Sequence, residues 1–335
     1  MQTSNSPLIG VRELTVRLST GQLAVDRVSF AIKRGECLSL VGESGCGKTL
    51  TALSLLKAVP REAGQSCASS IQLEGTELTK LSDKKMRPVR GGRISMIFQD
   101  PAASLNPLFT VGSQIVEAIG AHMRTSNKEA VERARSALAE AGLVETGRVF
   151  GSYPHQLSGG QCQRATIALA LATRPLLLIA DEPTTALDVT VQRQILDLLK
   201  LLKEEHGLAL LLITHNLSVV AQLADRVLIM YAGHIVEGAP AGKIFSAAAH
   251  PYTRALLDCL PSIEKRREEP ATIPGNVPQP GIWPAGCRFR PRCEFAGPGC
   301  ESDQSLEPLP QDVSHTVRCR LAGKLFGKAQ SSRGA

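Results

Sequence analysis

The sequence predicts an α/β fold organised around a parallel β-sheet, and three observations support this prediction. Two continuous apolar runs of strand length, residues 176–180 and 208–213, flank a segment with helical periodicity at residues 189–205, as in a β-α-β unit. A third apolar strand, residues 37–41, runs into a glycine-rich loop, after which a helix is expected to begin at Lys48. Hydrophobic residues make up 43% and charged residues 21% of the chain, which is typical of a globular protein with a core.

The length and charge of the chain limit its organisation and partners. Its 335 residues suffice for one large domain with an appendage or for two domains. The net charge of +7 suits an acidic partner such as a nucleotide, a nucleic acid or an anionic membrane surface, although a mildly basic protein needs no such partner. Aromatic residues are only 4% of the chain, which disfavours binding of nucleic acid by stacked aromatics.

No targeting or membrane-spanning segment is predicted. Residues 1–7 lack the basic and apolar regions of a secretory signal, and no apolar run approaches the roughly 20 residues of a membrane span. We therefore expect a soluble, cytoplasmic protein in which the nine cysteines do not form disulfides.

Short strands dominate the first hundred residues. Alternating apolar and β-branched residues predict strands over residues 8–40 with a turn at Gly21, and further short strands over residues 71–98. Between these two groups a helix is expected from Lys48 to about Lys57. The short strands predict an antiparallel β subdomain beside the parallel sheet.

The rest of the chain changes character twice. Apolar residues recur at helical spacing over residues 111–174. Residues 227–230 and 234–236 predict a hairpin with its turn at Ala232-Gly233. Beyond residue 262 proline becomes frequent and apolar periodicity disappears, which predicts an appendage with little regular structure.

The first motif that carries chemistry is the loop Gly42-Glu43-Ser44-Gly45-Cys46-Gly47-Lys48-Thr49, which has the pattern G-x-x-x-x-G-K-[ST]. Glycines let backbone N–H groups surround a phosphate, and the N-terminus of the following helix adds partial positive charge. We expect Lys48 to reach the β- and γ-phosphates of a nucleotide and the Thr49 hydroxyl to bind Mg²⁺. The plain alternative is a strand-to-helix turn without a ligand.

Two carboxylates follow the apolar strand at residues 176–180. Asp181 is expected to hold the Mg²⁺ shell, and Glu182 to orient and deprotonate the attacking water. Carboxylates at strand ends are often merely solvated. Together with the glycine-rich loop, however, this pair predicts a nucleotide-hydrolysing site.

A second glycine turn, Leu157-Ser158-Gly159-Gly160-Gln161, lies inside the helical region. Its plain interpretation is a helix capped by Ser158. The run resembles the signature motif of the ATP-binding subunits of ABC transporters. This resemblance implies a P-loop NTPase (RecA-like) ABC cassette, in which two cassettes pair head to tail and each signature loop faces the γ-phosphate held by the other subunit. A serine and a helix N-terminus would then face developing negative charge.

Further residues match that family in order along the chain. Gln99 matches the Q-loop, which touches Mg²⁺ and contacts the membrane partner. Ala186-Leu187-Asp188 matches the D-loop at the nucleotide across the dimer seam, with Thr185 in place of the usual serine. His215 matches the switch histidine that faces the γ-phosphate, although a lone histidine is more often structural. The chain departs from the family near Leu18, where no aromatic residue is available to stack on adenine.

Three longer stretches resemble one branch, the ATPases of oligopeptide, dipeptide and nickel importers. They are residues 98–107, which contain Phe-Gln-Asp-Pro and Ser-Leu-Asn-Pro, residues 153–156, and residues 250–257. The resemblance covers about residues 8 to 320. It implies an ABC ATPase domain at residues 1–261 with a helical subdomain at about 100–174, a C-terminal appendage at 262–323 and a mobile tail at 324–335.

Four cysteines lie in the proline-rich appendage, at Cys287, Cys293, Cys300 and Cys319. Disulfides are not expected in the cytoplasm. Structural zinc usually shows closer C-x2–4-C pairs, so zinc is the second candidate, and free thiols are the third. Four thiolates can also hold a [4Fe–4S] cluster, and the resemblance implies this cofactor. His315 is a spare candidate ligand, interpreted as an ordinary surface histidine.

The resemblance implies the ATP-hydrolysing subunit of an importer for peptides or a related small solute, peripheral on the cytoplasmic face of the inner (plasma) membrane. Its partners would be a second ABC ATPase subunit (a paralogue or a copy of itself), two transmembrane permease subunits and an extracytoplasmic solute-binding protein, with no nucleic acid. The alternative is a soluble ABC ATPase in DNA repair or translation, which usually carries two cassettes or a long coiled-coil insertion. A nucleotide sensor without activity is a third possibility, against which Glu182 and His215 argue.

Overall fold

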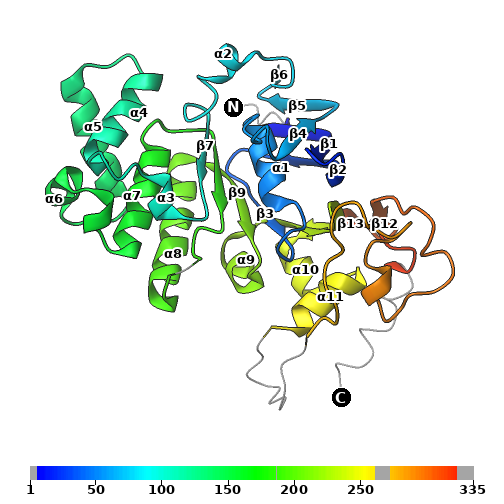
Figure 1. Cartoon of the computed structure of the whole chain (residues 1–335). Coiled ribbons are helices and arrows are strands. Elements are labelled where there is room, and N and C mark those ends of the chain that lie inside the picture. Colours follow the sequence, from blue (N-terminus) through cyan, green and yellow to red (C-terminus); the bar gives the residue numbers. More distant parts are fainter. Residues whose placement is uncertain (1–5, 186, 261–271, 323–335) are drawn as a thin grey trace. The chain divides into compact units, whose positions relative to one another are not determined.

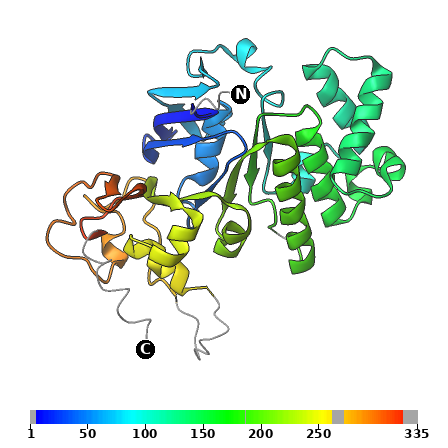
Figure 2. The same ribbon diagram turned by 180° about the vertical axis from the view of Figure 1, so that it is seen from behind.

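The computed structural model of the protein describes residues 6–185, 187–260 and 272–322. Within these residues the chain forms two compact units (Figures 1 and 2). The first unit contains residues 31–37 and 72–213 together with the residues before 10. The second unit contains residues 10–30, 38–71 and those from 214 onward.

The first unit contains three parallel strands in the order β7-β8-β9. They are β7 (Ile94–Ile97), β8 (Leu177–Asp181) and β9 (Ala209–Thr214). Every residue of β8 and β9 is buried, which explains their continuous apolar sequence. Helix α8 (Val189–His206) lies between β8 and β9 in the chain, so the predicted β-α-β unit is confirmed.

The helices that follow β7 form a bundle within the same unit. They are α3 (Pro101–Ser104), α4 (Val111–His122), α5 (Asn127–Glu140), α6 (Thr146–Gly151), the short 3-10 helix η1 (Pro154–Gln156) and α7 (Gly159–Leu171). Helices α4, α5, α6 and α7 pack against one another (Figure 1). Gly112 permits the contact between α4 and α6, because an added Cβ would lie 2.4 Å from the Phe150 ring. The predicted helical pattern is confirmed.

Smaller elements complete the first unit. Helix α2 (Asp83–Met86) precedes β7. Strand β6 (Thr76–Glu77) pairs in antiparallel fashion with the end of β5 (Ser70–Leu73).

The N-terminal part of the second unit holds strands where the sequence predicts them, although β1 and β2 have ten residues each and are longer than the short strands expected. Strand β1 (Ile9–Leu18) lies next to β2 (Leu23–Ile32) and pairs antiparallel with β4 (Gly64–Cys67). The turn between β1 and β2 passes through Gly21, whose φ is +85°. This confirms the turn expected there.

The second sheet of this unit has the strand order β3-β10-β11-β13-β12. Its strands are β3 (Cys37–Val41), β10 (Arg226–Tyr231), β11 (His234–Pro240), β12 (Glu307–Leu309) and β13 (Asp312–Val317). Strands β3 and β10 are parallel and the other pairs are antiparallel. The β10–β11 pair is the hairpin predicted from the sequence.

The helices of the second unit are short. They are α1 (Lys48–Leu55), α9 (Leu217–Leu223), α10 (Ala241–Ala247), α11 (Pro251–Asp258) and the 3-10 helix η2 (Arg290–Arg292). No helix of the described residues is long and apolar enough to cross a membrane.

The C-terminal segment is more closely tied to the sheet than the sequence predicts. Strand β13 pairs with β11, and β12 pairs with β13, so two strands that the sequence analysis missed extend the sheet. Phe289 also packs on Tyr231 and Tyr252, with ring centroids 5.3 Å from each. These aromatic residues are part of the buried core of the second unit. The predicted tail from residue 324 lies outside the described residues.

Candidate functional site

The glycine-rich loop predicted to bind phosphate joins β3 to α1 in the second unit. Gly45 and Gly47 have φ angles of +78° and +107°, which strain any residue with a Cβ. Gly42 has no room for a side chain, because an added Cβ would lie 2.1 Å from the Met230 carbonyl oxygen. Glycine at these positions therefore allows the loop to follow this path.

Lys48 is the first residue of α1, and its side chain folds back over the loop. Its Nζ donates to the carbonyl oxygens of Gly42 at 2.7 Å and Glu43 at 2.9 Å, and only 6% of the residue is exposed. Ser44 and Thr49, in contrast, are exposed. The loop thus places an ammonium group and a solvent-accessible hydroxyl at a helix N-terminus, an arrangement suited to a phosphate and its cation.

Cys46 contributes its backbone rather than its thiol to this loop. The thiol is buried, with Sγ 3.8 Å from Lys48 Nζ, and burial raises the pKa of this group. The Cys46 carbonyl accepts a hydrogen bond from the Gly233 N–H at 2.9 Å. The β10–β11 turn therefore helps to hold the loop in place through this backbone hydrogen bond.

His215 lies directly after β9 and is exposed. The next residue, Asn216, caps α9 by accepting from the Ser218 N–H at 2.9 Å, and its own N–H donates to Thr214 Oγ1 at 3.0 Å. These bonds fix the backbone on which His215 is presented.

Glu182 follows β8 in the first unit, and two side chains donate to its carboxylate. Gln99 Nε2 lies 3.0 Å and Thr185 Oγ1 2.9 Å from Glu182 Oε2. The φ of Glu182 is +48°, a left-handed value that is uncommon for a residue with a Cβ and is often found at functional sites. Asp181, the last residue of β8, is 3% exposed. The structure therefore brings together Gln99 and Glu182, two of the predicted catalytic residues.

The second glycine-containing loop precedes α7 in the first unit. Ser158 Oγ accepts from the Gln161 N–H at 3.3 Å, and Gln161 Oε1 accepts from the Ser158 N–H at 3.2 Å. This capping box confirms Ser158 as the N-cap of α7. Ser158 and Gly159 remain exposed, and Gly160 is half-buried. The loop is thus accessible to a ligand from outside the chain.

The segment that matches the D-loop lies beside this second loop. Asp188 Oδ1 caps α8 by accepting from the Val191 N–H at 2.9 Å, and the residue is exposed. The Leu187 side chain would be 3.8 Å from a Cβ added at Gly159. Ala186 lies outside the described residues.

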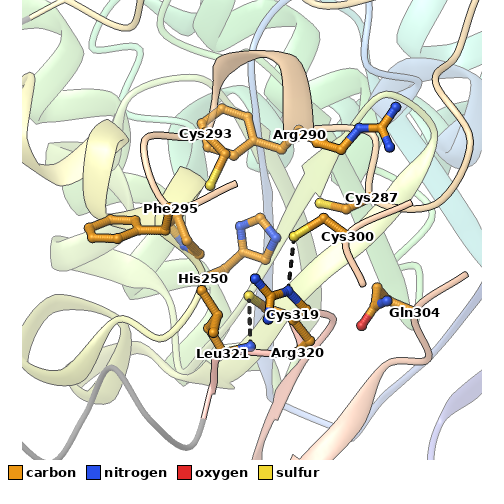
Figure 3. A pocket seen from close by; sticks show the side chains of 12 residues that line it. His250, Cys287, Arg290, Cys293, Phe295, Cys300, Gln304, Cys319, Arg320 and Leu321 are labelled. Carbon is orange, nitrogen blue, oxygen red and sulfur yellow. Dashed lines mark hydrogen bonds between the residues drawn. The ribbon is translucent and has the colours of Figure 1, made fainter. Parts of the chain in front are cut away.

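The four C-terminal cysteines line one cavity in the second unit, and the imidazole of His250 lines it as well (Figure 3). The backbone ties the cysteine-bearing segments to each other, since the Cys287 N–H donates to the Cys300 carbonyl at 2.8 Å. The sequence spacing alone did not show that Cys287, Cys293, Cys300 and Cys319 converge.

Two groups donate to sulfur atoms in this cavity. Arg320 Nε lies 3.1 Å from Cys300 Sγ, and the Leu321 N–H lies 3.4 Å from Cys319 Sγ (Figure 3). Burial opposes ionisation of Cys300, but the hydrogen bond from Arg320 prevails and lowers the pKa of this thiol. Burial raises the pKa of Cys293 to about 11. Occupation of the cavity by a thiolate-bound group would therefore release protons.

His250 presents an N–H group to the same cavity. Its Nδ1 accepts from the Tyr252 N–H at 3.1 Å, which places the ring proton on Nε2. Among the described residues Nε2 is buried and has no hydrogen-bond partner. Burial lowers the pKa of His250 to about 4, so the ring is neutral near pH 7. A buried, neutral imidazole among the lining residues is compatible with a sulfur-rich occupant.

His315 is not a surface residue, and that interpretation was wrong. Only 2% of His315 is exposed, and its Nε2 lies 2.7 Å from Glu237 Oε1. The other Glu237 contacts are the N–H groups of Ala249 at 2.6 Å and His250 at 2.9 Å. His315 thus belongs to a buried polar network that fixes the start of α11, and it does not line the cysteine cavity.

Two family profiles match separate parts of the chain. The profile described as ABC transporter matches residues 25–185, and the profile described as Oligopeptide/dipeptide transporter, C-terminal region, matches residues 236–300. A peptide import ATP-binding protein of Brucella melitensis is 44% identical over 331 residues, which cover 94% of this chain and 97% of that protein. The chain belongs to the ABC transporter family.

Other members of this family give the same result. A peptide ABC transporter ATP-binding protein of Sinorhizobium fredii is 48% identical over 294 residues, covering 86% of this chain and 88% of that protein. An ATP-binding cassette solved as a dimer with ADP and Pi matches with a TM-score of 0.61 and 30% identity, covering 70% of this chain and 98% of that one. A Clostridium perfringens cassette from an ABC transporter complex matches with a TM-score of 0.63 and 26% identity, covering 72% of this chain and 92% of that one.

Sequence reasoning missed two kinds of functional residue in this ABC protein. Thr185 was noted only as a departure from the family, yet its hydroxyl makes the hydrogen bond to Glu182 that a serine could also make. Tyr252 was noted only as part of the branch-specific stretch 250–257, and Arg292 only as a positive charge near the cysteines, although both contact Glu43 of the phosphate loop. Their separations from Glu43, 209 and 249 residues, leave no periodic signal in the sequence.

Proposed function

We propose that this protein is the ATP-hydrolysing subunit of an ABC importer for peptides or a related small solute. The observation that carries the ATPase assignment is the Glu182 carboxylate, held at a left-handed backbone position by Gln99 and Thr185. The transported class rests on the relatives, which are peptide import ATP-binding proteins, and on the match of residues 236–300 to the oligopeptide/dipeptide C-terminal region.

Binding of ATP and Mg²⁺ is assigned to residues predicted from the sequence. The loop from Gly42 to Gly47 would surround the phosphates with backbone N–H groups, and Lys48 would turn from the loop carbonyls toward the β- and γ-phosphates. Mg²⁺ is a hard cation that prefers oxygen ligands, which Thr49, Asp181 and Gln99 would supply.

Hydrolysis is assigned to Glu182 as general base for the attacking water. Gln99 and Thr185 donate the two hydrogen bonds to Oε2. These bonds fix the orientation of the carboxylate that would accept the proton of the water. His215 would face the γ-phosphate from the exposed position after β9. Proton transfer to a positioned base of this kind typically contributes about 10²–10⁴-fold to a rate.

The exposed second loop is assigned to a partner cassette. Ser158, Gly159, Gly160, Gln161 and Asp188 would approach the γ-phosphate bound by the other subunit, which is a paralogue or a second copy of this chain. Support comes from the exposure of Ser158 and Asp188 and from the relative solved as a dimer with ADP and Pi.

Exposed apolar side chains near Gln99 suit contact with the transmembrane permease subunits. Phe98, Leu108 and Phe109 are 46%, 78% and 55% exposed, an unusual set of large apolar residues for a water-facing surface. The Val111 N–H donates to the Ser152 carbonyl at 2.9 Å, which brings this loop next to the half-exposed Tyr153. The chain would thus lie peripherally on the cytoplasmic face of the inner membrane, below permeases served by an extracytoplasmic solute-binding protein.

A [4Fe–4S] cluster is the proposed occupant of the cysteine cavity. Four thiols, two donors to sulfur and the buried Nε2–H of His250 fit a sulfur-rich group. In the described part of the chain no three His, Cys, Asp or Glu side chains are arranged to hold a metal ion, so the cluster is proposed from the thiols and donors of the cavity alone and zinc remains the second candidate. When bound, the cluster would tie together a segment that lacks an apolar core of its own.

Reconstitution tests the transport function. The chain would be expressed with its permeases and partner cassette in proteoliposomes, and ATP-dependent uptake of labelled peptides would be measured against a Lys48→Ala variant. We expect uptake only with the unmodified chain. Recovery of nucleic acid without permeases in a pull-down would instead favour a soluble ABC ATPase, a class that the two named peptide-import relatives do not support.

An anaerobic absorption spectrum with iron and zinc analysis tests the cofactor. We expect charge-transfer absorption in the visible range and about four iron atoms per chain, both lost when Cys293 and Cys300 are replaced by serine. Zinc bound without visible absorption would overturn the cluster assignment.

A further inference from the structure

Glu43 is a phosphate-loop residue whose side chain the proposed mechanism does not use, yet it is held by the C-terminal segment. Arg292 Nη1 and Nη2 donate to Glu43 Oε1 and Oε2 at 3.0 and 3.1 Å. The Arg292 side chain is 5% exposed and that of Glu43 is 30% exposed. A two-pronged, largely buried pair of this kind fixes direction as well as distance.

A second contact reaches the backbone of the same residue. The Glu43 N–H donates to the Tyr252 hydroxyl oxygen at 3.1 Å. Tyr252 is fully buried on α11, and its ring centroid lies 4.6 Å from that of Tyr231. Glu43 is therefore fixed both at its carboxylate and at its main chain by residues that come more than 200 positions later.

Arg292 is itself held in place by the C-terminal segment. Its Nε donates to the Pro274 carbonyl at 2.8 Å, Nη2 to the Ile273 carbonyl at 3.3 Å, and Nη1 to the Tyr231 hydroxyl at 3.3 Å. Because every nitrogen of the guanidinium has a partner, its position depends on the fold of this segment. Cys293, one of the cavity thiols, is the next residue in the chain.

The contacts continue from Glu43 to the lysine that binds phosphate. The Glu43 carbonyl is one of the two acceptors of Lys48 Nζ. The loop itself contains Gly42, Gly45 and Gly47, whose freedom of φ and ψ makes its shape dependent on such external contacts. A shift of Glu43 would thus move both the backbone N–H groups and the resting position of Lys48.

We propose that Arg292 and Tyr252 are positioning residues of the phosphate loop, and that through Arg292 the C-terminal cysteine segment, residues 272–322, sets the affinity of this chain for ATP. The inference rests on the proposed role of Lys48 in binding ATP. It adds that residues more than 200 positions after the phosphate loop act on the nucleotide site of this protein.

Equilibrium titration of the full chain with a fluorescent ATP analogue and Mg²⁺ tests this inference. Arg292→Gln removes the two-pronged contact and is expected to weaken binding about tenfold, since charge-assisted hydrogen bonds are the strong ones and tenfold corresponds to about 1.4 kcal/mol. Glu43→Gln should give a similar loss, and the double variant should be no worse than either single variant. Arg292→Lys should restore part of the affinity.

Controls separate positioning from general stability. Lys243→Gln removes an ion pair with Asp312 in the same unit, on an exposed side chain, and should leave the affinity unchanged. The turnover number at saturating ATP should stay within about twofold of the unmodified chain in the Arg292→Gln variant, because the hydrolytic residues are untouched. Metal content would be measured for every variant.

Two results would overturn the inference: unchanged affinity of folded Arg292→Gln protein, or losses that simply add in the double variant. Should Arg292→Gln not fold, Tyr252→Phe removes only the hydroxyl acceptor and should still weaken binding about threefold; no loss there would equally contradict the inference. If Lys48→Ala binds ATP normally, the proposed nucleotide site is wrong, whereas loss in Lys48→Ala without loss in Arg292→Gln rejects the positioning role alone.

Discussion

The two glycine-containing loops of this protein both precede a helix, yet they are supported in opposite ways. The phosphate loop receives contacts from β10, from the β10–β11 turn and from the C-terminal segment. The second loop, from Ser158 to Gln161, is held by its own capping box. An added Cβ at Gly42 would lie 2.1 Å from a backbone oxygen, whereas at Gly159 the nearest atom is a Leu187 methyl at 3.8 Å.

This difference shows how the two loops can share one task. A loop that binds ATP in its own chain benefits from being shaped in advance by distant residues, since ordering then costs nothing on binding. A loop that must reach nucleotide on another subunit needs exposure instead, and a local capping box gives it a fixed shape without covering it.

The largest effect is expected at Glu182, the proposed general base for hydrolysis. Glu182→Gln keeps the hydrogen bond from Thr185 but removes the base, so ATP turnover should fall by about 10²–10⁴-fold while ATP affinity stays the same. Turnover in the assembled transporter and binding to the isolated chain would be measured separately. Normal turnover in this variant would show that another group activates the water.

The next effect distinguishes the two loops directly. Lys48→Ala should weaken ATP binding to the isolated chain by about 100-fold, because it removes a charged donor to phosphate. Ser158→Ala should leave this affinity unchanged and lower turnover only in the assembled cassette pair. An equal loss of affinity in both variants would mean that the signature loop acts within its own chain.

Replacing glycine by alanine should change the free energy of unfolding differently in the two loops. Gly42→Ala forces a Cβ against the Met230 carbonyl and should reduce the free energy of unfolding by about 1–3 kcal/mol. Gly159→Ala has room and lies in the first turn of α7, where alanine is favoured, so it should be neutral or stabilising by up to about 1 kcal/mol. Urea midpoints of the two variants measure this contrast, which fails if both lose stability equally.

The last effect concerns pH and the β10–β11 turn that contacts the phosphate loop. Burial lowers the pKa of His234 to about 4, although its hydrogen bond to Asp26 opposes the shift. Below pH 6.5 His234 binds a proton in the unfolded chain, whereas in the folded chain it stays neutral until about pH 4. The free energy of unfolding should therefore decline as the pH falls from 6.5 to 4. Comparing urea midpoints at pH 6.5 and 4.5, His234→Gln should show a smaller decline than the unmodified chain. An unchanged decline would assign the pH dependence to other groups.

Much of the fold was predictable because its signals are local. The buried strands β8 and β9 are continuous apolar runs, the hairpin β10–β11 has its glycine turn, and Ser158 caps α7 as its sequence indicates. Strands β12 and β13 were missed because they are short and mostly polar, and they form only because β13 pairs with the edge of β11 and β12 pairs with β13.

The site was predictable to the extent that motifs are contiguous. The sequence indicated Lys48, Gln99 and Glu182 from runs of a few residues. It could not indicate that Arg292 donates hydrogen bonds to Glu43, or that His315 is buried against Glu237. Such contacts join residues that are far apart in the chain and are linked by no sequence motif or periodicity. Interpretation of His315 as a surface residue failed because a single histidine carries no burial signal of its own.

The pairing of β13 with β11 also determines how far the chain can be shortened from its C-terminus for experiments. A version shortened after α11 would lack β13 and bare a hydrogen-bonding edge of β11, which invites self-association. It would also lack Arg292 and its contact with Glu43, so its nucleotide affinity would misrepresent that of the intact molecule. Biochemical work on this protein therefore needs the residues after α11 in place.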